Sequence, residues 1–194
     1  PAVVFIILFG LVTLLTLLAR AFLPTAFSQE APSDYVNYYR PVAEALLQGE
    51  RFKDLGELAF LYPPGYPLLI ALSLWLSSSL RLDPALVQHF FSITFISGAA
   101  FVLYLITKRL VGEKWWAWIP AFALITYPFV VWLGLQPNSE IPFMFFLYFG
   151  FWLILRKPIK IVHGLLAGLA VGVAMLIRPI AIGLGVVLAL CMLV

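Results

Sequence analysis

The sequence predicts an all-α membrane protein: a polytopic bundle of transmembrane helices whose external first loop carries short juxtamembrane helices. Hydrophobic residues occupy 63% of the 194 positions and charged residues only 11%, whereas soluble domains carry about 25% charged residues. Several stretches approach the length of about 20 apolar residues that crosses the hydrocarbon core of a bilayer. Because the chain begins at Pro1 and ends at Val194 inside an apolar run, we expect it to be the amino-terminal part of a longer protein.

Six segments are apolar enough to be expected as membrane spans. In chain order they are 2–23, 85–107, 115–135, 141–155, 159–177 and 179–194. In the fifth segment, small residues recur at Gly164, Ala167, Gly168 and Gly172. Small residues let helix backbones approach closely in lipid, so this pattern predicts a helix–helix contact rather than a phosphate-binding loop.

The stretch 24–84 separates the first two expected spans and contains two candidates for short helices. One is 41–48, because Pro41 is acceptable in a first helical turn and Gly49 ends the helix. The other is 67–79, which is apolar but short and ends in three serines. Its composition is compatible both with a membrane span and with a juxtamembrane helix that lies in the interface.

Lysine and arginine form two clusters beside the spans: Lys108, Arg109 and Lys114, and Arg156, Lys157 and Lys160. Two expected spans separate the clusters, so both lie on one side of the membrane, which the positive-inside rule makes cytoplasmic. If 67–79 lies in the interface, the loop 24–84 is external. If 67–79 spans the membrane, the segment that precedes it is cytoplasmic. The counts of lysine and arginine permit both topologies. The isoelectric point near 9.1 thus reflects topology, and we expect no nucleic-acid partner.

The first candidate for chemistry is Asp34, which follows the first expected span. A carboxylate just above a membrane surface is placed to act as general base toward an acceptor hydroxyl. The alternative is a turn or helix-cap aspartate, since Ser and Asp are common capping residues.

The second candidate is the motif Tyr62-Pro63-Pro64-Gly65-Tyr66-Pro67. Three prolines and a glycine predict a rigid bend and exclude a regular helix there. The tyrosines of such a bend are suited to stacking on a sugar ring. The alternative is a stiff entry into the following helix.

Two more candidates lie between spans. Glu140 follows Asn138 in a polar break and opens the next expected helix, where a carboxylate favours the positive end of the helix dipole; it is equally suited to bind a hydroxyl or a metal. Arg178 lies on the face opposite the two basic clusters, which suggests an anionic partner such as a phosphate. The alternative for Arg178 is contact with lipid headgroups.

Other common chemistries lack support in the sequence. The single Cys191 excludes a disulfide within this chain. His89 and His163 lie far apart, and no group of metal-ligating residues has the spacing of a zinc site. No nucleotide-binding loop and no Ser/His/Asp set is present.

The order of these elements resembles the GT-C glycosyltransferases, especially the protein-mannosyltransferase-like and aminoarabinose-transferase-like branches. The matching stretches are Asp34 with Tyr38, Ala43-Glu44-Ala45-Leu46-Leu47-Gln48-Gly49, Tyr62-Pro63-Pro64-Gly65-Tyr66-Pro67-Leu68-Leu69, Asn138-Ser139-Glu140, and the Gly-rich segment that ends in Arg178-Pro179. The resemblance covers nearly the whole chain and depends on the order and spacing of the motifs.

The resemblance implies inverting transfer of a sugar from a polyprenyl-phosphate donor to a glycan, lipid or protein acceptor. Asp34 would be the catalytic base and Arg178 would contact the donor phosphate. The implied substrate-binding residues are Tyr38, Tyr62, Pro64, Asn138, Glu140 and Arg178. Many relatives have an Asp-Glu pair where this chain has Asp34-Tyr35, so no cofactor is implied with certainty and a role for a divalent metal stays open.

The resemblance also selects one topology. In the family, the helix after the Pro-Pro motif lies in the interface and the preceding loop is external. Asp34, Glu140 and Arg178 would then face the same external side of a multi-pass protein in the cell membrane. Two other functions remain as alternatives: a transporter or flippase with broken helices, and a non-catalytic membrane subunit.

Overall fold

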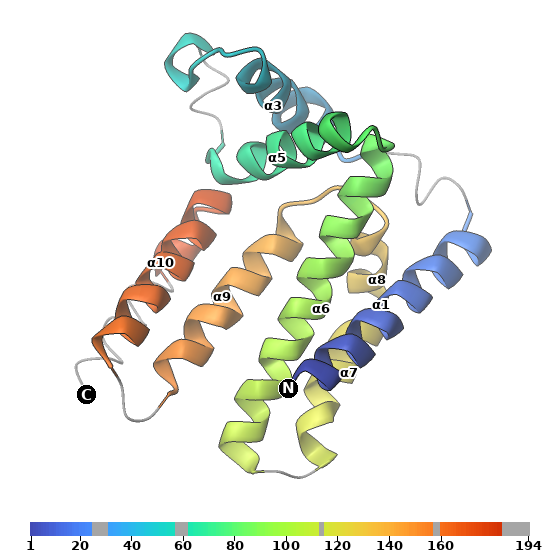
Figure 1. Ribbon diagram of the computed structural model, residues 1–194, viewed down its shortest axis with the longest axis vertical. Coiled ribbons are helices and arrows are strands. Elements are labelled where there is room, and N and C mark those ends of the chain that lie inside the picture. Colours follow the sequence, from blue (N-terminus) through green and yellow to red (C-terminus); the bar gives the residue numbers. More distant parts are fainter. Residues whose placement is uncertain (25–30, 57–61, 113–114, 157–159, 184–194) are drawn as a thin grey trace.

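The computed structural model describes residues 1–24, 31–56, 62–112, 115–156 and 160–183, and every regular element in these ranges is a helix (Figure 1). The prediction of an all-α protein is therefore confirmed. The longer helices form a bundle: α1 (Ala2–Phe22), α6 (Pro84–Val111), α7 (Trp118–Thr126), α8 (Pro128–Gly134), α9 (Glu140–Ile154) and α10 (Ile161–Ile177).

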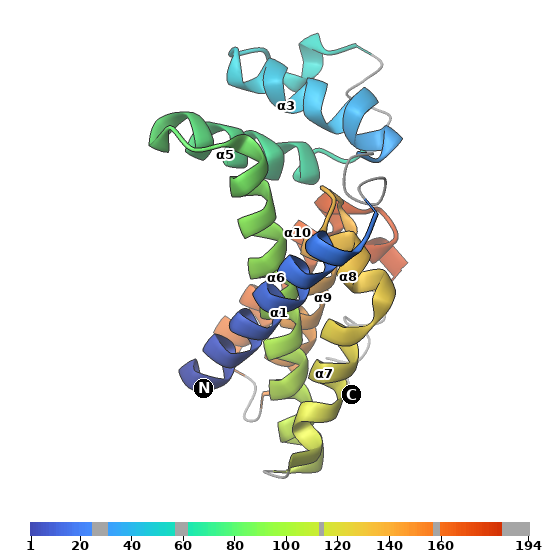
Figure 2. The same ribbon diagram turned by 90° about the vertical axis from the view of Figure 1, so that its right-hand side faces the viewer.

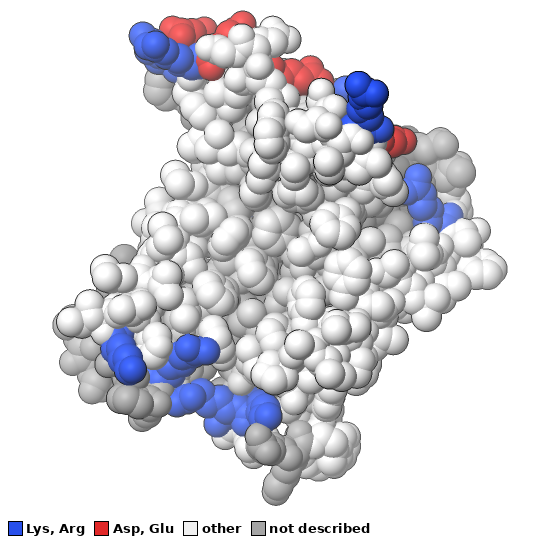
Figure 3. Space-filling view, in the orientation of Figure 1, with Lys and Arg blue, Asp and Glu red and all other residues white. Residues whose placement is uncertain are grey.

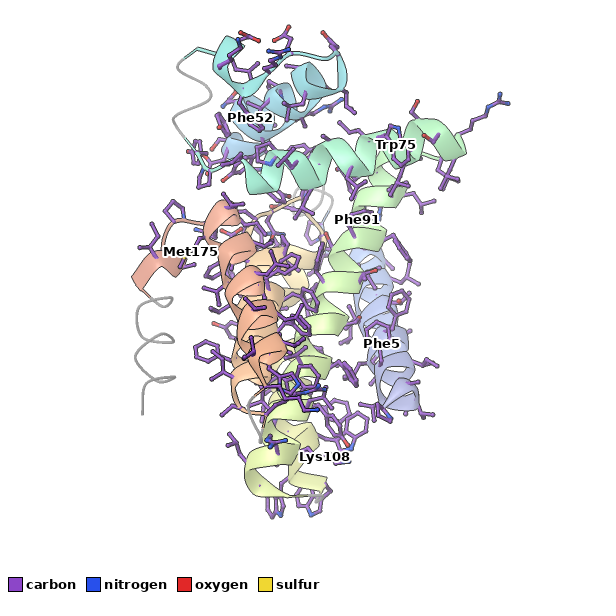
Figure 4. All side chains as sticks on the ribbon, turned by 60° about the vertical axis from the view of Figure 1, so that its left-hand side comes forward. Phe5, Phe52, Trp75, Phe91, Lys108 and Met175 are labelled. Atoms are coloured by element: carbon purple, nitrogen blue, oxygen red, sulfur yellow. The ribbon has the colours of Figure 1, made fainter. Side chains whose placement is uncertain are left out.

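A second group of helices covers one end of this bundle, and we call it the upper layer. It comprises the π-helix η1 (Tyr35–Tyr39), α3 (Arg40–Leu47), the 3-10 turn η2 (Phe52–Asp54) and α5 (Gly65–Leu80). Figures 1 and 2 show α5 lying across the ends of the bundle helices, with α3 beyond it. In Figure 4 the labelled Phe52 of this layer and Lys108 of α6 lie at opposite ends of the molecule.

Within the described residues, two helices are long and apolar enough to cross a membrane: α1, with 21 residues, and α6, with 28. A third candidate arises if α7 and α8 count as one span, although they meet at an angle of 58°. With 15 and 17 residues, α9 and α10 are apolar but shorter. The expected span 179–194 lies mostly outside the described residues.

The expected single segment 115–135 is divided into three pieces. A 3-10 turn, η3 (Trp115–Ala117), precedes α7, and a break at Tyr127 separates α7 from α8. Tyr127 is extended (φ −65°, ψ 119°) because the ring of Pro128 disfavours a helical conformation of the residue before it. Pro128 then opens α8, where its missing N–H is not needed.

The start of α5 corrects a second expectation. The motif that begins at Tyr62 was expected to exclude a regular helix through Pro67, but α5 begins at Gly65. The first N–H groups of a helix have no partner within the helix, so Pro67 is accommodated in the first turn. At its other end α5 stops at Arg81, whose φ of 55° is left-handed, and the chain turns into α6.

Two buried clusters hold these layers together. The first lies within the bundle and joins α1, α6, α7, α8 and α9 through Leu8, Val12, Ile96, Ala100, Ala121, Ile125, Val130, Leu133 and Ile141. The second joins η1, α3 and α5 to the end of α10 through Tyr35, Tyr38, Tyr39, Val42, Ala43, Tyr66, Ile70, Ala71 and Ile177. The second cluster therefore docks the upper layer on α10.

Helix α10 packs on α9, but not through the expected glycines. A Cβ on Gly168 or Gly172 would meet no described atom within 4 Å. The contact is made by Ala167 and neighbouring small residues of α10 against Gly150 of α9, where a Cβ would lie 2.9 Å from a methyl carbon of Val171. Of the predicted small residues, Ala167 therefore takes part in the close contact, whereas Gly168 and Gly172 lie away from it.

Candidate active site

A cavity of about 620 Å³ lies between the upper layer and the adjacent ends of α8, α9 and α10. We call it the polar cavity. Its volume falls in the range of about 300–1,000 Å³ that is usual for small-molecule sites. Among the expected site residues, its lining includes Asp34, Tyr62, Asn138, Glu140 and Arg178. Residues from widely separated parts of the sequence thus meet in one place.

Asp34 enters the polar cavity from the start of η1. Its backbone is helical (φ −62°, ψ −36°) and its side chain makes no capping hydrogen bond, so the helix-cap alternative receives no support. Instead, the Tyr62 hydroxyl donates a hydrogen bond of 3.1 Å to Asp34 Oδ1. The following residues form a π-helix, an uncommon element that is frequent at functional sites.

Tyr38 lies behind this carboxylate and outside the cavity lining. Its side chain is 3% exposed, and its hydroxyl donates to the Tyr62 carbonyl oxygen at 3.0 Å. The Tyr38 and Tyr62 rings pack with their centroids 4.6 Å apart. Tyr38 therefore positions Tyr62. Pro64 also lies outside the lining, at the N-cap of α5, where its carbonyl accepts a hydrogen bond from the Leu68 N–H at 3.1 Å.

The tyrosines of this wall stay protonated at neutral pH. Burial raises the pKa of Tyr39; its hydrogen bond with Ser139 lowers that pKa, and the charges of Asp34 and Arg178 respectively raise and lower it. The pKa of Tyr62 is raised chiefly because its hydroxyl donates to the Asp34 carboxylate. Neutral hydroxyls can donate hydrogen bonds to a carboxylate or to a substrate.

The opposite wall of the polar cavity carries an ion pair between Arg178 and Glu140. Arg178 Nη1 also donates to Ser139 Oγ at 3.3 Å. The two charged side chains remain 37% and 43% exposed, so a ligand can reach both. Arg178 is extended (φ −144°, ψ 124°) directly after α10, as expected for a residue before proline.

Asn138 has a structural task that limits its availability to a ligand. Its amide nitrogen donates to the carbonyl oxygens of Leu133 at 2.6 Å and Gln136 at 2.8 Å. Its amide oxygen accepts from the Ile141 N–H at 3.1 Å. These bonds hold the turn between α8 and α9 and thereby place Ser139 and Glu140.

An apolar groove of about 520 Å³ continues from the polar cavity along α9. It shares Glu140 and Arg178 with the cavity, and Phe143, Met144 and Leu147 of α9 line it further along. A charged group at the Arg178 end and an apolar chain along α9 would therefore occupy neighbouring, connected spaces.

Several cavity residues carried too little signal to be expected from sequence. Tyr39 and Trp132 line the polar cavity but were not predicted, whereas Gln136, which also lines it, belongs to the polar break before Glu140. A helical projection of 34–39 could have indicated Tyr39, because Tyr35, Tyr38 and Tyr39 share a buried side of η1. Trp132 lies in an apolar run and has no distinguishing pattern. Arg20 does not line the polar cavity, and its Nη1 lies 3.4 Å from His89 Nε2.

Within the described ranges, no group of three or more His, Cys, Asp or Glu side chains is placed to hold a metal ion. Comparison with known proteins finds no matching family model, no matching curated protein and no matching solved structure.

Proposed function

We propose that this chain is part of an integral-membrane glycosyltransferase that moves a sugar from a polyprenyl-phosphate donor to an acceptor at the external face. The main support for this proposal is the polar cavity, which has Asp34 on one wall and Arg178 on the other and is joined to an apolar groove along α9. A lipid phosphate has the matching parts: an anion, an attached sugar and a long apolar chain.

In the proposed reaction, Asp34 acts on the acceptor and Arg178 on the donor. The acceptor hydroxyl gives its proton to the Asp34 carboxylate while its oxygen bonds to the anomeric carbon of the sugar. The bond between that carbon and the phosphate oxygen breaks, and its electron pair stays on the phosphate. The Arg178 guanidinium and the Ser139 hydroxyl stabilise the departing anion, which is often a large contribution to catalysis.

Arg178 would have to exchange partners during this reaction. It is paired with Glu140, and a donor phosphate placed in the polar cavity would compete for the same guanidinium. Glu140 then serves to hold the arginine in place while the site is empty. An arginine is well suited to such an exchange because carboxylate and phosphate present similar oxygen geometry to its guanidinium group.

Our proposed membrane arrangement is multi-pass, with the bundle helices crossing and α5 lying in the external interface. The described residues at the end of the bundle away from the upper layer include the bases Lys108, Arg109, Arg156 and Lys160 but no acid, whereas the described acids lie at the other end. Figure 3 displays this difference on one face. The positive-inside rule counts lysine and arginine in the short loops beside spans. Because the described residues of both basic clusters lie in or beside such loops at the end away from the upper layer, we infer that the upper layer is external.

The lengths of α9 and α10 also suit this arrangement. At about 1.5 Å per residue they would extend over roughly 22–26 Å, slightly less than a hydrocarbon core of about 30 Å. Local thinning of the bilayer and long basic side chains that reach its surface accommodate such a mismatch.

Site-directed labelling tests the topology. Cysteine introduced at the exposed Asn37, in a chain whose native Cys191 is serine, should react with a membrane-impermeant thiol reagent in intact cells. Cysteine at the exposed Lys160 should react only after the membrane is permeabilised. Labelling of both positions, or of Lys160 alone, in intact cells would contradict the proposed arrangement.

A transfer assay with a polyprenyl-phosphate sugar tests the function. Asp34→Asn should lower turnover by about 10²–10⁴-fold, the usual contribution of a general base, with little effect on expression. Asp54→Asn is the matched control, because Asp54 is exposed in η2 and lies outside the polar cavity. Equal turnover by both variants would remove Asp34 from the mechanism.

The bend between α7 and α8 favours a transporter or flippase as the second candidate, because broken helices line the paths of many transporters. The two functions differ in their products. Movement of a lipid-linked sugar across a vesicle membrane without a new glycosidic bond would favour transport over transfer.

A further inference from the structure

The upper layer and α10 meet at a close backbone contact at Gly65, the first residue of α5. A Cβ on Gly65 would lie 2.6 Å from the carbonyl carbon and oxygen of Leu176 and 2.9 Å from the amide nitrogen of Ile177. Real Cβ atoms essentially never approach other atoms this closely. Because the neighbours are backbone atoms, no side-chain rotation can make room for a larger residue.

Other glycines of the described chain differ from Gly65 in this respect. Gly98 is tight against the Phe145 ring, at 2.7 Å, and Gly150 against a Val171 methyl group, at 2.9 Å, but those are side chains that can shift. Gly168 has no described neighbour within 4 Å. Among these glycines, Gly65 is the one at which an added carbon must move one backbone away from another.

The two backbones that meet here carry opposite walls of the polar cavity. Gly65 follows closely after Tyr62, whose hydroxyl holds Asp34, and Leu176 shortly precedes Arg178. Ile177, which lies between Leu176 and Arg178 in the sequence, is 1% exposed and packs in the tyrosine-rich cluster of the upper layer. Neither Gly65 nor Leu176 lines the polar cavity, so a change in their separation acts on the site only through position.

We propose that Gly65 is a positioning residue that sets the separation between the Asp34 wall and the Arg178 wall of the polar cavity. The role in catalysis rests on the proposed function, whereas the geometric role does not. A methyl group at Gly65 would push the upper layer away from α10. The donor phosphate and lipid chain would keep their contacts, because Arg178, Ser139 and the apolar groove all belong to α8, α9, α10 and the segments that adjoin them.

The first test compares Gly65→Ala with Gly168→Ala in the full-length protein. Gly65→Ala should lower turnover at least tenfold while the affinity for polyprenyl phosphate changes less than twofold. Gly168→Ala should leave both quantities unchanged, because its methyl group meets no described atom within 4 Å. Equal turnover by the two variants would overturn the proposal, as would a parallel loss of turnover and phosphate affinity, which indicates general misfolding.

The second test measures geometry without relying on activity. Spin labels on cysteines at Gln48 of the upper layer and Leu169 of α10, in a Cys191→Ser background, report the separation of the two parts. Gly65→Ala should lengthen or broaden this distance distribution. A control pair at Leu110 and Leu169 lies within the bundle and should not change. An unchanged distance for the first pair would overturn the proposal.

Ile177→Ala provides a second route if Gly65→Ala does not fold. It removes atoms from the same junction instead of adding one, and it should broaden the Gln48–Leu169 distance distribution; an unchanged distribution would again overturn the proposal. If the wild-type protein transfers no sugar at all, the proposed function fails, and the label distances still decide whether Gly65 sets the position of the upper layer.

Discussion

The two carboxylates of the polar cavity, Asp34 and Glu140, have different surroundings. Asp34 accepts a hydrogen bond from the neutral Tyr62 hydroxyl, and within the described part of the chain no ion pair involves it. Glu140 is paired with Arg178, which also contacts Ser139. Asp34 is thus an exposed carboxylate held by a hydroxyl, whereas Glu140 is a carboxylate held by a guanidinium.

This difference follows from the two layers that build the cavity. Asp34 directly precedes η1 of the upper layer and is held by the Tyr62 hydroxyl. Glu140 begins α9 in the bundle and faces the end of the antiparallel neighbour α10, where Arg178 follows the last turn. The comparison teaches that the cavity places a tyrosine-bound carboxylate and an arginine-bound carboxylate on opposite walls.

The two residues of the ion pair, Arg178 and Glu140, should differ most strongly when each is replaced by glutamine. Arg178→Gln should lower turnover by about 10²–10³-fold, the usual cost of losing one stabilising donor, and should weaken phosphate binding. Glu140→Gln should strengthen phosphate binding severalfold because it removes the competing carboxylate, with near-normal turnover. Binding and transfer assays on both variants check this. Equal losses of turnover and phosphate binding in the two variants would contradict this expectation and show that the two residues act as one structural pair.

A smaller effect is expected for Tyr62→Phe. The variant loses the hydrogen bond to Asp34 but keeps the ring that packs on Tyr38 and Tyr39. Because the hydroxyl is exposed to solvent, water can replace it, and turnover should fall only about two- to fivefold. Steady-state kinetics check this, and a loss as large as that of Asp34→Asn would mean that Tyr62 itself takes part in the chemistry.

The smallest effect concerns stability at alkaline pH. Burial raises the pKa of Tyr38 and Tyr39 above the ordinary value of 10.0, so the folded state binds these protons more tightly than the unfolded state. The free energy of unfolding should therefore be unaffected below that value and should fall as the pH rises above it. Limited proteolysis of the upper layer, compared with tyrosinate absorbance, checks this. Cleavage that does not increase above that pH would contradict it.

Helix positions were predictable where local signals set them. The expected helix 41–48 is α3 (Arg40–Leu47), because Pro41 fits a first turn and Gly49, with a φ of 90°, suits the residue after a helix. The break in 115–135 was less apparent, since the apolar composition outweighed the two prolines of the segment, Pro120 and Pro128, and only Pro128 lies at the break. The π-helix at Tyr35–Tyr39 had no sequence signal that we recognise.

The candidate site was predictable in part. Asp34, Glu140 and Arg178 stood out because ionisable residues are costly and scarce beside expected membrane spans, Tyr62 stood out because it opens a proline-rich bend, and the polar cavity contains all four. Tyr38 has the same residue type as Tyr62, yet it does not line the polar cavity. Whether a tyrosine of η1 lines the cavity depends on which side of η1 packs against α5.

By itself, the sequence determined the helical class, the apolar segments and the concentration of basic residues near the ends of particular helices. These properties depend on composition and on residues close to one another in the chain. Only the tertiary structure decided that Tyr62 meets Asp34, that Arg178 meets Glu140 and that α5 rests on α10 at Gly65. Such contacts join residues that are far apart in sequence, and they depend on how whole helices pack, a property that no local pattern encodes.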